Sequence, residues 1–70
     1  MPAEPMPVEQ PKHPTAQMTM YELRDYRRQL ENAIAFFDRQ EPVPPARERL
    51  RQRLAEVLAE QEQRVRAARG

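Results

Sequence analysis

The sequence predicts an all-α protein in which two amphipathic helices fold into an antiparallel hairpin behind a proline-rich N-terminal tail. Three observations predict it. Prolines are concentrated in residues 1–17 and again in residues 42–45. After each proline-rich segment, apolar residues recur at steps of three and four, which places them on one face of an α-helix. The expected parts are a tail over 1–17 and a hairpin over 18–69, with helices at about 19–39 and 45–68 and a loop at 40–44.

The first 17 residues are not expected to form regular secondary structure. Their prolines remove backbone N–H donors and restrict the residues before them, and few large apolar side chains lie between. We expect a disordered or polyproline-like tail. The stretches 2–5 and 11–14 match the loose PxxP pattern that aromatic grooves bind, but a solvated tail is the favoured interpretation.

The first helix has a complete start signal. Thr19 is followed three residues later by Glu22, the spacing of a capping box, and Met18 and Leu23 occupy the positions of a hydrophobic staple. The apolar stripe that follows consists of Leu23, Tyr26, Leu30, Ala33, Ile34 and Phe37.

Prolines separate the two helices. Pro42 and Pro44 interrupt any continuous helix, while Pro45 suits the first helical turn, where its missing N–H costs nothing. A short loop of this kind is typical of adjacent antiparallel helices. The stripe of the second helix is Leu50, Leu54, Val57, Leu58, Gln61 and Val65.

Folding the two stripes together predicts which residues meet. Phe37 should face Leu50, and Leu30 should meet Val57 or Leu58. Tyr26 should lie near Gln61 and form the one polar layer. Two acid-before-base pairs four residues apart, Glu60 with Arg64 and Glu62 with Arg66, should support the exposed side of the second helix.

Chain size suggests that the hairpin needs a partner. Folds shorter than about 70–80 residues usually require a disulfide, a metal or a second chain for stability. The chain has 70 residues, no cysteine and a single histidine, His13, which excludes a disulfide, a thiolate metal site and a multi-histidine metal site. Association with another chain is the remaining way to stabilise the fold.

The expected contact lies at the end of the first helix. Residues 33–37 are all apolar, and Phe36 is turned about 100° from Phe37, so an isolated hairpin leaves Phe36 exposed. We expect a homodimer that forms a four-helix bundle, in preference to docking on a different protein. The predicted interface is Tyr26, Leu30, Ile34, Phe36, Phe37, Leu50, Leu54, Val57 and Leu58.

An arginine cluster offers an alternative function. Arg47, Arg49, Arg51 and Arg53 flank Leu50 and suit contacts with phosphates or an acidic partner. A net charge of only +1 and the lack of a helix-turn-helix connection argue against nucleic acid. Nucleic-acid binding is therefore the second hypothesis, behind a protein adaptor or regulatory subunit.

The residue inventory argues against catalysis. Serine and cysteine are absent, the only glycine is the last residue, and His13 lies in the tail. These absences remove the usual nucleophiles and any glycine-rich phosphate loop. We expect no enzyme activity, no cofactor, no metal and no small-molecule substrate. No apolar run is long enough to span a membrane and no signal peptide is recognisable, so the expected location is the cytoplasm.

Overall fold

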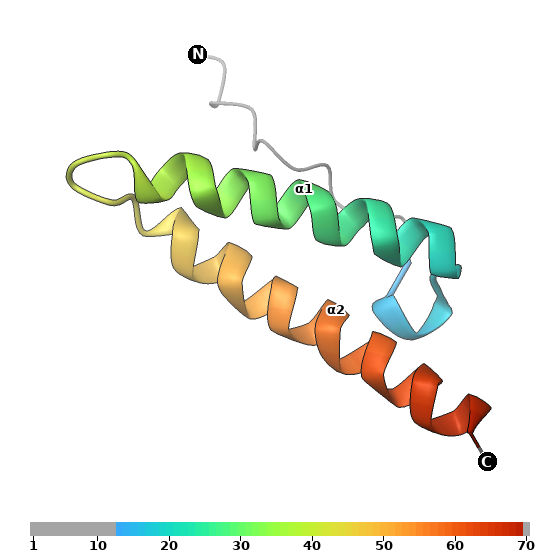
Figure 1. Ribbon diagram of the computed structural model, residues 1–70. Coiled ribbons are helices and arrows are strands. Elements are labelled where there is room, and N and C mark those ends of the chain that lie inside the picture. The colour runs from blue at the N-terminus through green and yellow to red at the C-terminus, as the bar shows by residue number, and fades with distance from the viewer. Residues whose placement is uncertain (1–12, 70) are drawn as a thin grey trace.

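The computed structural model describes residues 13–69, and all of their regular structure is helical (Figure 1). A single 3-10 turn, η1 (Thr15–Gln17), precedes two long helices, α1 (Met20–Asp38) and α2 (Ala46–Ala68). The two long helices pack against each other and run in opposite directions (Figure 1). The predicted two-helix hairpin is confirmed. Most of the predicted tail, residues 1–12, lies outside the described residues.

The start of α1 is set by local hydrogen bonds, as predicted. The Thr19 hydroxyl oxygen accepts from the Glu22 N–H at 3.0 Å, and the Glu22 carboxylate accepts from the Thr19 N–H at 2.9 Å. Together they form the capping box, which satisfies two backbone donors at the helix start. Met18 and Leu23 are both buried, as a hydrophobic staple requires.

The loop closes the hairpin within one residue of the predicted positions. Pro45 has helical backbone angles, φ −58° and ψ −24°, but it immediately precedes α2 instead of being its first residue. Beside the loop, Arg47 donates to the Asp38 carboxylate at 2.7 Å and joins the end of α1 to the start of α2. The Glu41–Pro42 peptide bond is cis.

The core is a single seam between the two helices. Leu23, Leu30, Leu50 and Val57 are its fully buried large side chains among the described residues. Met18, Tyr26 and Ala33 are also buried, and Ile34, Phe37 and Leu54 pack against them while half-exposed. The whole predicted stripe of α1 therefore lies in or against the core, whereas on α2 only Leu50, Leu54 and Val57 do.

The predicted polar layer is wrong, and part of the predicted stripe of α2 lies outside the core. Leu58 is 39% exposed and lies outside the buried core, because one helical step from the fully buried Val57 turns it about 100° away. The polar layer also differs. The Tyr26 hydroxyl accepts from Arg53 at 3.4 Å, whereas Gln61 accepts from Arg27 at 3.2 Å. Tyr26 and Gln61 thus emerge at different sides of the seam and each pairs with an arginine there.

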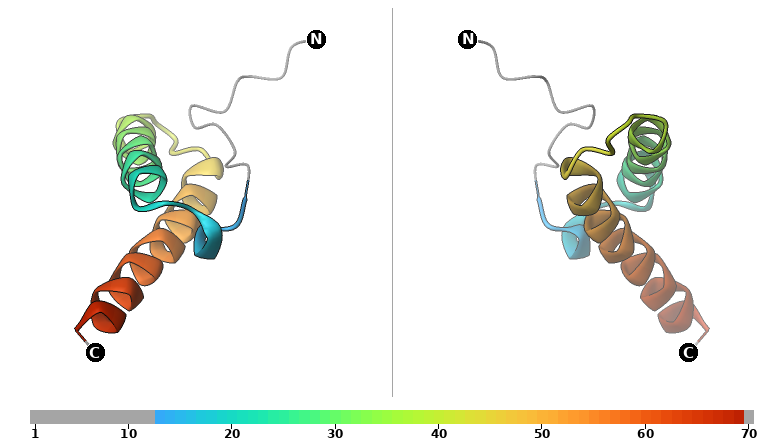
Figure 2. Two further views of the ribbon diagram at one scale, coloured as in Figure 1. Left: turned by 90° about the vertical axis from the view of Figure 1, so that its right-hand side faces the viewer. Right: turned by 90° about the vertical axis from the view of Figure 1, so that its left-hand side faces the viewer.

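The helices separate toward the C-terminus of α2 (Figure 1), and η1 lies to one side of the seam, beside α2 (Figure 2). The turn packs against α2 on one side of the hairpin. Residues 13–17 were assigned to the tail by sequence. In the structure this segment packs against α2 and is joined to α1 through His13.

Candidate functional site

The predicted interface residues divide into those that the hairpin buries itself and those that it leaves exposed. Tyr26, Leu30, Leu50 and Val57 are buried within the chain. Ile34, Phe37 and Leu54 are half-exposed at the edge of the core. Only Phe36 and Leu58 are exposed, by 58% and 39%. An intermolecular contact therefore has to use the exposed and half-exposed members of the predicted set.

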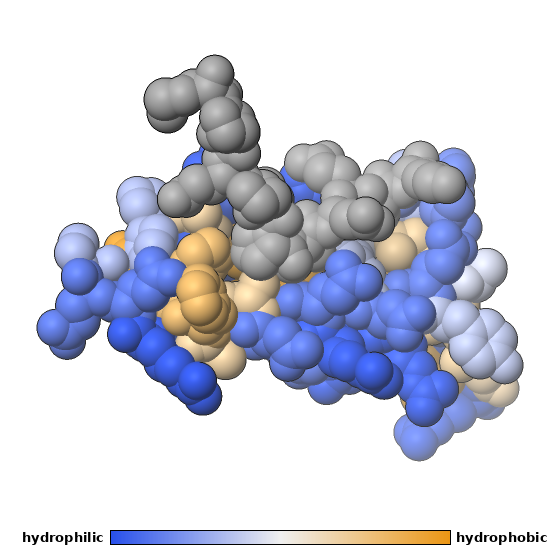
Figure 3. Space-filling view, turned by 90° about the horizontal axis from the view of Figure 1, so that it is seen from above, coloured by the Kyte–Doolittle hydropathy of each residue, from blue (hydrophilic) through white to orange (hydrophobic). Residues whose placement is uncertain are grey.

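Phe36 lies near the loop end of α1. Its ring meets Phe37 edge-on, with the ring centroids 5.7 Å apart. Phe37 turns toward the core, while Phe36 points a quarter-turn away from it, as the sequence predicts. The space-filling view shows hydrophobic residues gathered toward the loop end, with hydrophilic residues beside them (Figure 3).

Further exposed and half-exposed apolar side chains lie along one side of the hairpin, and their spacing in the sequence does not distinguish them from the core. On α2, Leu54, Leu58 and Val65 follow one another at steps of four and seven, so they share one flank of the helix. On α1, Met20 and Ile34 are fourteen residues apart and also share a flank. We call this surface the open face: Met20, Ile34, Leu54, Leu58 and Val65.

A groove shows that the two flanks belong to the same side. It has a volume of about 420 Å³ and lies between the separating ends of the helices. Its lining combines α1 and α2 residues: Met20, Leu23, Arg27, Gln61, Arg64, Val65 and Ala68. Since the exposed Met20 and Val65 border one groove with the buried Leu23, the open face is continuous across the seam at this end.

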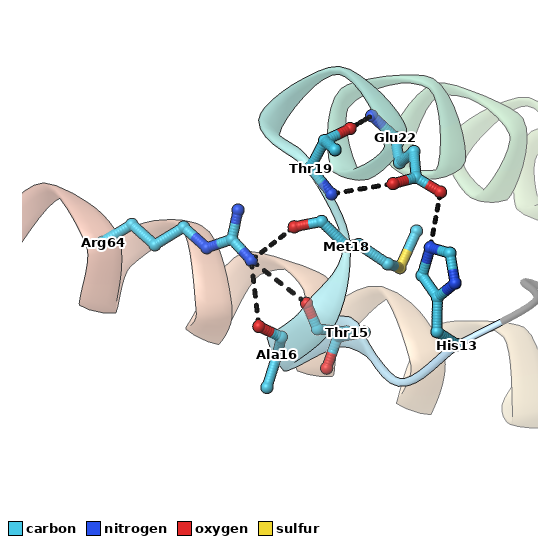
Figure 4. A network of polar contacts seen from close by, with 7 residues as sticks. All are labelled: His13, Thr15, Ala16, Met18, Thr19, Glu22 and Arg64. Carbon is cyan, nitrogen blue, oxygen red and sulfur yellow. Dashed lines mark hydrogen bonds and ion pairs between the residues drawn. The ribbon is translucent and has the colours of Figure 1, made fainter.

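The N-terminal segment covers the side of the seam away from the open face. We call residues 13–18 the strap. Arg64 holds it, because one guanidinium nitrogen donates to the carbonyl oxygens of Met18 at 2.6 Å, Thr15 at 3.3 Å and Ala16 at 3.4 Å (Figure 4). The Thr15 carbonyl, within the 3-10 turn, also accepts from the Met18 N–H at 3.2 Å, so Arg64 reinforces the turn as well as joining it to α2. The same side chain donates through Nε to Glu60 at 2.8 Å, which confirms the predicted pair.

A second contact fixes the beginning of the strap. His13 Nε2 lies 2.7 Å from Oε2 of Glu22, the carboxylate of the capping box (Figure 4). Glu22 thus joins the strap to the first turn of α1. The pKa of Glu22 is lowered, chiefly because the carboxylate accepts from the Thr19 backbone N–H and secondarily because of His13.

The lowered pKa predicts how stability depends on pH. Because the carboxylate is more acidic in the folded chain, its ionised form stabilises the fold above the ordinary carboxyl value of 4.5. This contribution is lost as the pH falls through the folded pKa. Glu22→Gln keeps a side chain able to complete the capping box but removes the charge. The stability difference between wild type and Glu22→Gln should be largest near neutral pH and should shrink in acid.

Urea unfolding between about pH 7 and about pH 3 measures this difference. His13→Ala is the matched variant. It should retain part of the pH dependence, since the larger cause, the Thr19 N–H, remains. A difference between wild type and Glu22→Gln that is independent of pH would contradict the role of the ionised carboxylate.

The predicted arginine cluster is divided between two flanks of α2. Arg47 donates to Asp38, and Arg53 donates to the Tyr26 hydroxyl on the other side. Arg51 lies 4.0 Å from Glu48, and Arg49 is exposed. Three of the four arginines therefore have partners within the chain, and together they do not present one basic surface.

Residues 13–69 contain neither a candidate metal site nor a membrane-spanning helix. In this range no three His, Cys, Asp or Glu side chains are gathered as a metal site requires. Neither of the two long helices described is apolar enough over a sufficient length to cross a membrane. Comparison with protein-family models, curated proteins and solved structures finds no match to this chain. Its function is therefore inferred from its own side chains.

Proposed function

We propose that this chain is a small non-catalytic protein-interaction module, an adaptor or regulatory subunit that acts in association with a second chain. Another copy of itself is the preferred partner, and the product is a four-helix bundle. The observation that carries this proposal is the amount of apolar side chain left outside the core. The exposed large apolar residues are Met20, Tyr21, Phe36, Val43, Leu58 and Val65.

Two helices cannot enclose a core by themselves, because each buries only the stripe that faces the other. Ile34, Phe37 and Leu54 are accordingly left half-exposed at the edges of the seam. Moving one such side chain from full exposure to full burial stabilises a protein by about 1.5–3 kcal/mol, and these three residues have gained part of that within the hairpin. A second hairpin would supply the remaining burial for several side chains at once, which is how four-helix bundles are built.

The arrangement of arginines favours a protein partner over nucleic acid. Binding to a phosphate backbone depends on several cations that act together on one surface. Here Arg47 and Arg53 are engaged at opposite flanks of α2. Exposed apolar side chains, in contrast, lie on both sides of the hairpin, with Phe36 on one side and Met20, Leu58 and Val65 on the other.

Analytical ultracentrifugation of the full chain tests the proposal. Between about 1 and about 100 µM we expect a reversible monomer–dimer equilibrium, with a thermal midpoint that rises with concentration because association stabilises the folded state. Circular dichroism at each concentration reports the helix content. A chain that stays fully helical and monomeric over the whole range would overturn the preferred homodimer.

A further inference from the structure

The two sides of the hairpin are not equivalent. The strap covers one side, where Arg64 and Glu22 hold it (Figures 2 and 4). Phe36 shares the flank of α1 that carries Glu22, since the two residues are fourteen positions apart. The open face lies on the other side, and no described segment of the chain covers it.

Four charges on the open side lie at similar distances before and after the middle of their helix, and each of them also has an ion-pair partner on its own helix. Arg27 lies two residues before the middle of α1, and Glu31 lies two residues after it. On α2, Arg51 lies one turn before Leu54 and Glu62 one turn after Leu58, at similar distances from the middle. Two contacts, Arg27 with Gln61 and Asp38 with Arg47, place the middle of α1 beside the middle of α2.

Such a pattern is self-complementary when one copy is turned end over end. In an interface with two-fold symmetry, a residue that meets a second residue is met by it in return. A two-fold axis through the middle of the hairpin brings Arg27 of one copy toward Glu31 of the other, and Arg51 toward Glu62. Leu58, one residue beyond the middle of α2, then lies close to the axis and faces its own counterpart.

The shape of the hairpin favours the same arrangement. The helices lie close together near the loop and separate at the other end (Figures 1 and 2). Turning one copy end over end places its narrow end on the wide end of the other. Two copies with their loops together would instead leave both wide ends facing each other across the groove beside Met20 and Val65.

We propose that the open face is the docking surface for a second copy of this chain. The two copies pack end over end, α1 against α1 and α2 against α2, with Leu58 near the two-fold axis. This inference rests on the proposed homodimer and specifies its face and its direction. It also places Phe36 outside the self-association interface, in contrast to the expectation from sequence.

Two variants that introduce the same charge on opposite sides test the face. Leu58→Glu places a carboxylate at the proposed axis, whereas Phe36→Glu places one on the other side, and both positions are exposed in the hairpin. We expect Leu58→Glu to raise the dimer dissociation constant at least about tenfold, and Phe36→Glu to change it less than about threefold. Circular dichroism should show unchanged helix content for both. Loss of the dimer in Phe36→Glu alone would overturn the proposed face while leaving the homodimer intact.

A charge exchange tests the direction of packing. Arg51→Glu and Glu62→Arg should each weaken the homodimer about fivefold, because each creates like-charge pairs across the axis. Mixing the two variants in equal amounts should restore wild-type affinity, since each end-over-end heterodimer then holds two opposite-charge pairs. Single variants that dimerise like wild type, or a mixture that gains nothing, would overturn the end-over-end arrangement. A wild-type chain that is monomeric throughout would instead remove the homodimer itself.

Discussion

Replacing Leu30 with alanine is expected to unfold the hairpin under conditions in which the wild-type chain is folded. Leu30 is 0% exposed and occupies the middle of the seam. Truncation of a buried leucine costs about 2–5 kcal/mol, because the transfer energy is lost and a cavity remains. A hairpin with only four fully buried large side chains has little stability in reserve. The loss should therefore appear as a collapse of helix content.

Far-ultraviolet circular dichroism during urea unfolding measures this effect at one fixed protein concentration. Tyr21→Ala is the matched control, since it also truncates a large side chain but at an exposed position of α1. It should change the free energy of unfolding by less than about 0.5 kcal/mol. Equal losses in the two variants would contradict a core centred on the α1–α2 seam.

Arg64→Ala is expected to release the strap from α2. The guanidinium donates to three strap carbonyls and joins them to α2. Hydrogen bonds to charged groups contribute about 1.5–3 kcal/mol when buried. The Arg64 side chain is 29% exposed, so water screens part of this interaction and we expect a loss of about 1–2 kcal/mol. Met18, which the strap carries into the core, should become exposed.

Amide hydrogen exchange locates this loss. The Gln17 and Met18 N–H groups, which donate to Pro14 and Thr15, should exchange faster in Arg64→Ala, while the centre of α1 stays protected. Arg66→Ala is the control. It removes a similar glutamate pair two residues away, on a side chain that is 77% exposed, and should cost less than about 0.5 kcal/mol. Unchanged exchange in the strap would show that Arg64 does not hold it.

The strap gives the hairpin two unlike sides, and this bears on its association. If Arg64→Ala uncovers the seam beside Tyr26 and Met18, a second apolar surface becomes available. Additional exposed apolar surfaces that pair with a different surface lead to open-ended association, whereas a single self-complementary face gives a closed dimer. In the proposed homodimer, the strap would cover the side of the seam that the second copy does not use.

Much of the fold could be predicted because its signals are local. The capping box at Thr19 and Glu22 fixes the start of α1, and both partners lie within one helical turn. The prolines of the loop separate the helices by restricting their own backbone and that of their neighbours. The spacing of Leu23, Leu30, Leu50 and Val57 gives the buried stripe, because helical periodicity depends only on position along the chain.

The sidedness of the molecule was decided only by the tertiary structure. Arg64 forms its predicted pair with Glu60, four residues away, but its strap contacts lie 46 to 49 residues distant in sequence, and no local pattern predicts them. The same holds for Leu58, which belongs to the predicted stripe yet lies outside the core. Periodicity defines the apolar face of each helix. Which flank of that face is covered depends on how the two helices separate and on which side of the seam the strap packs.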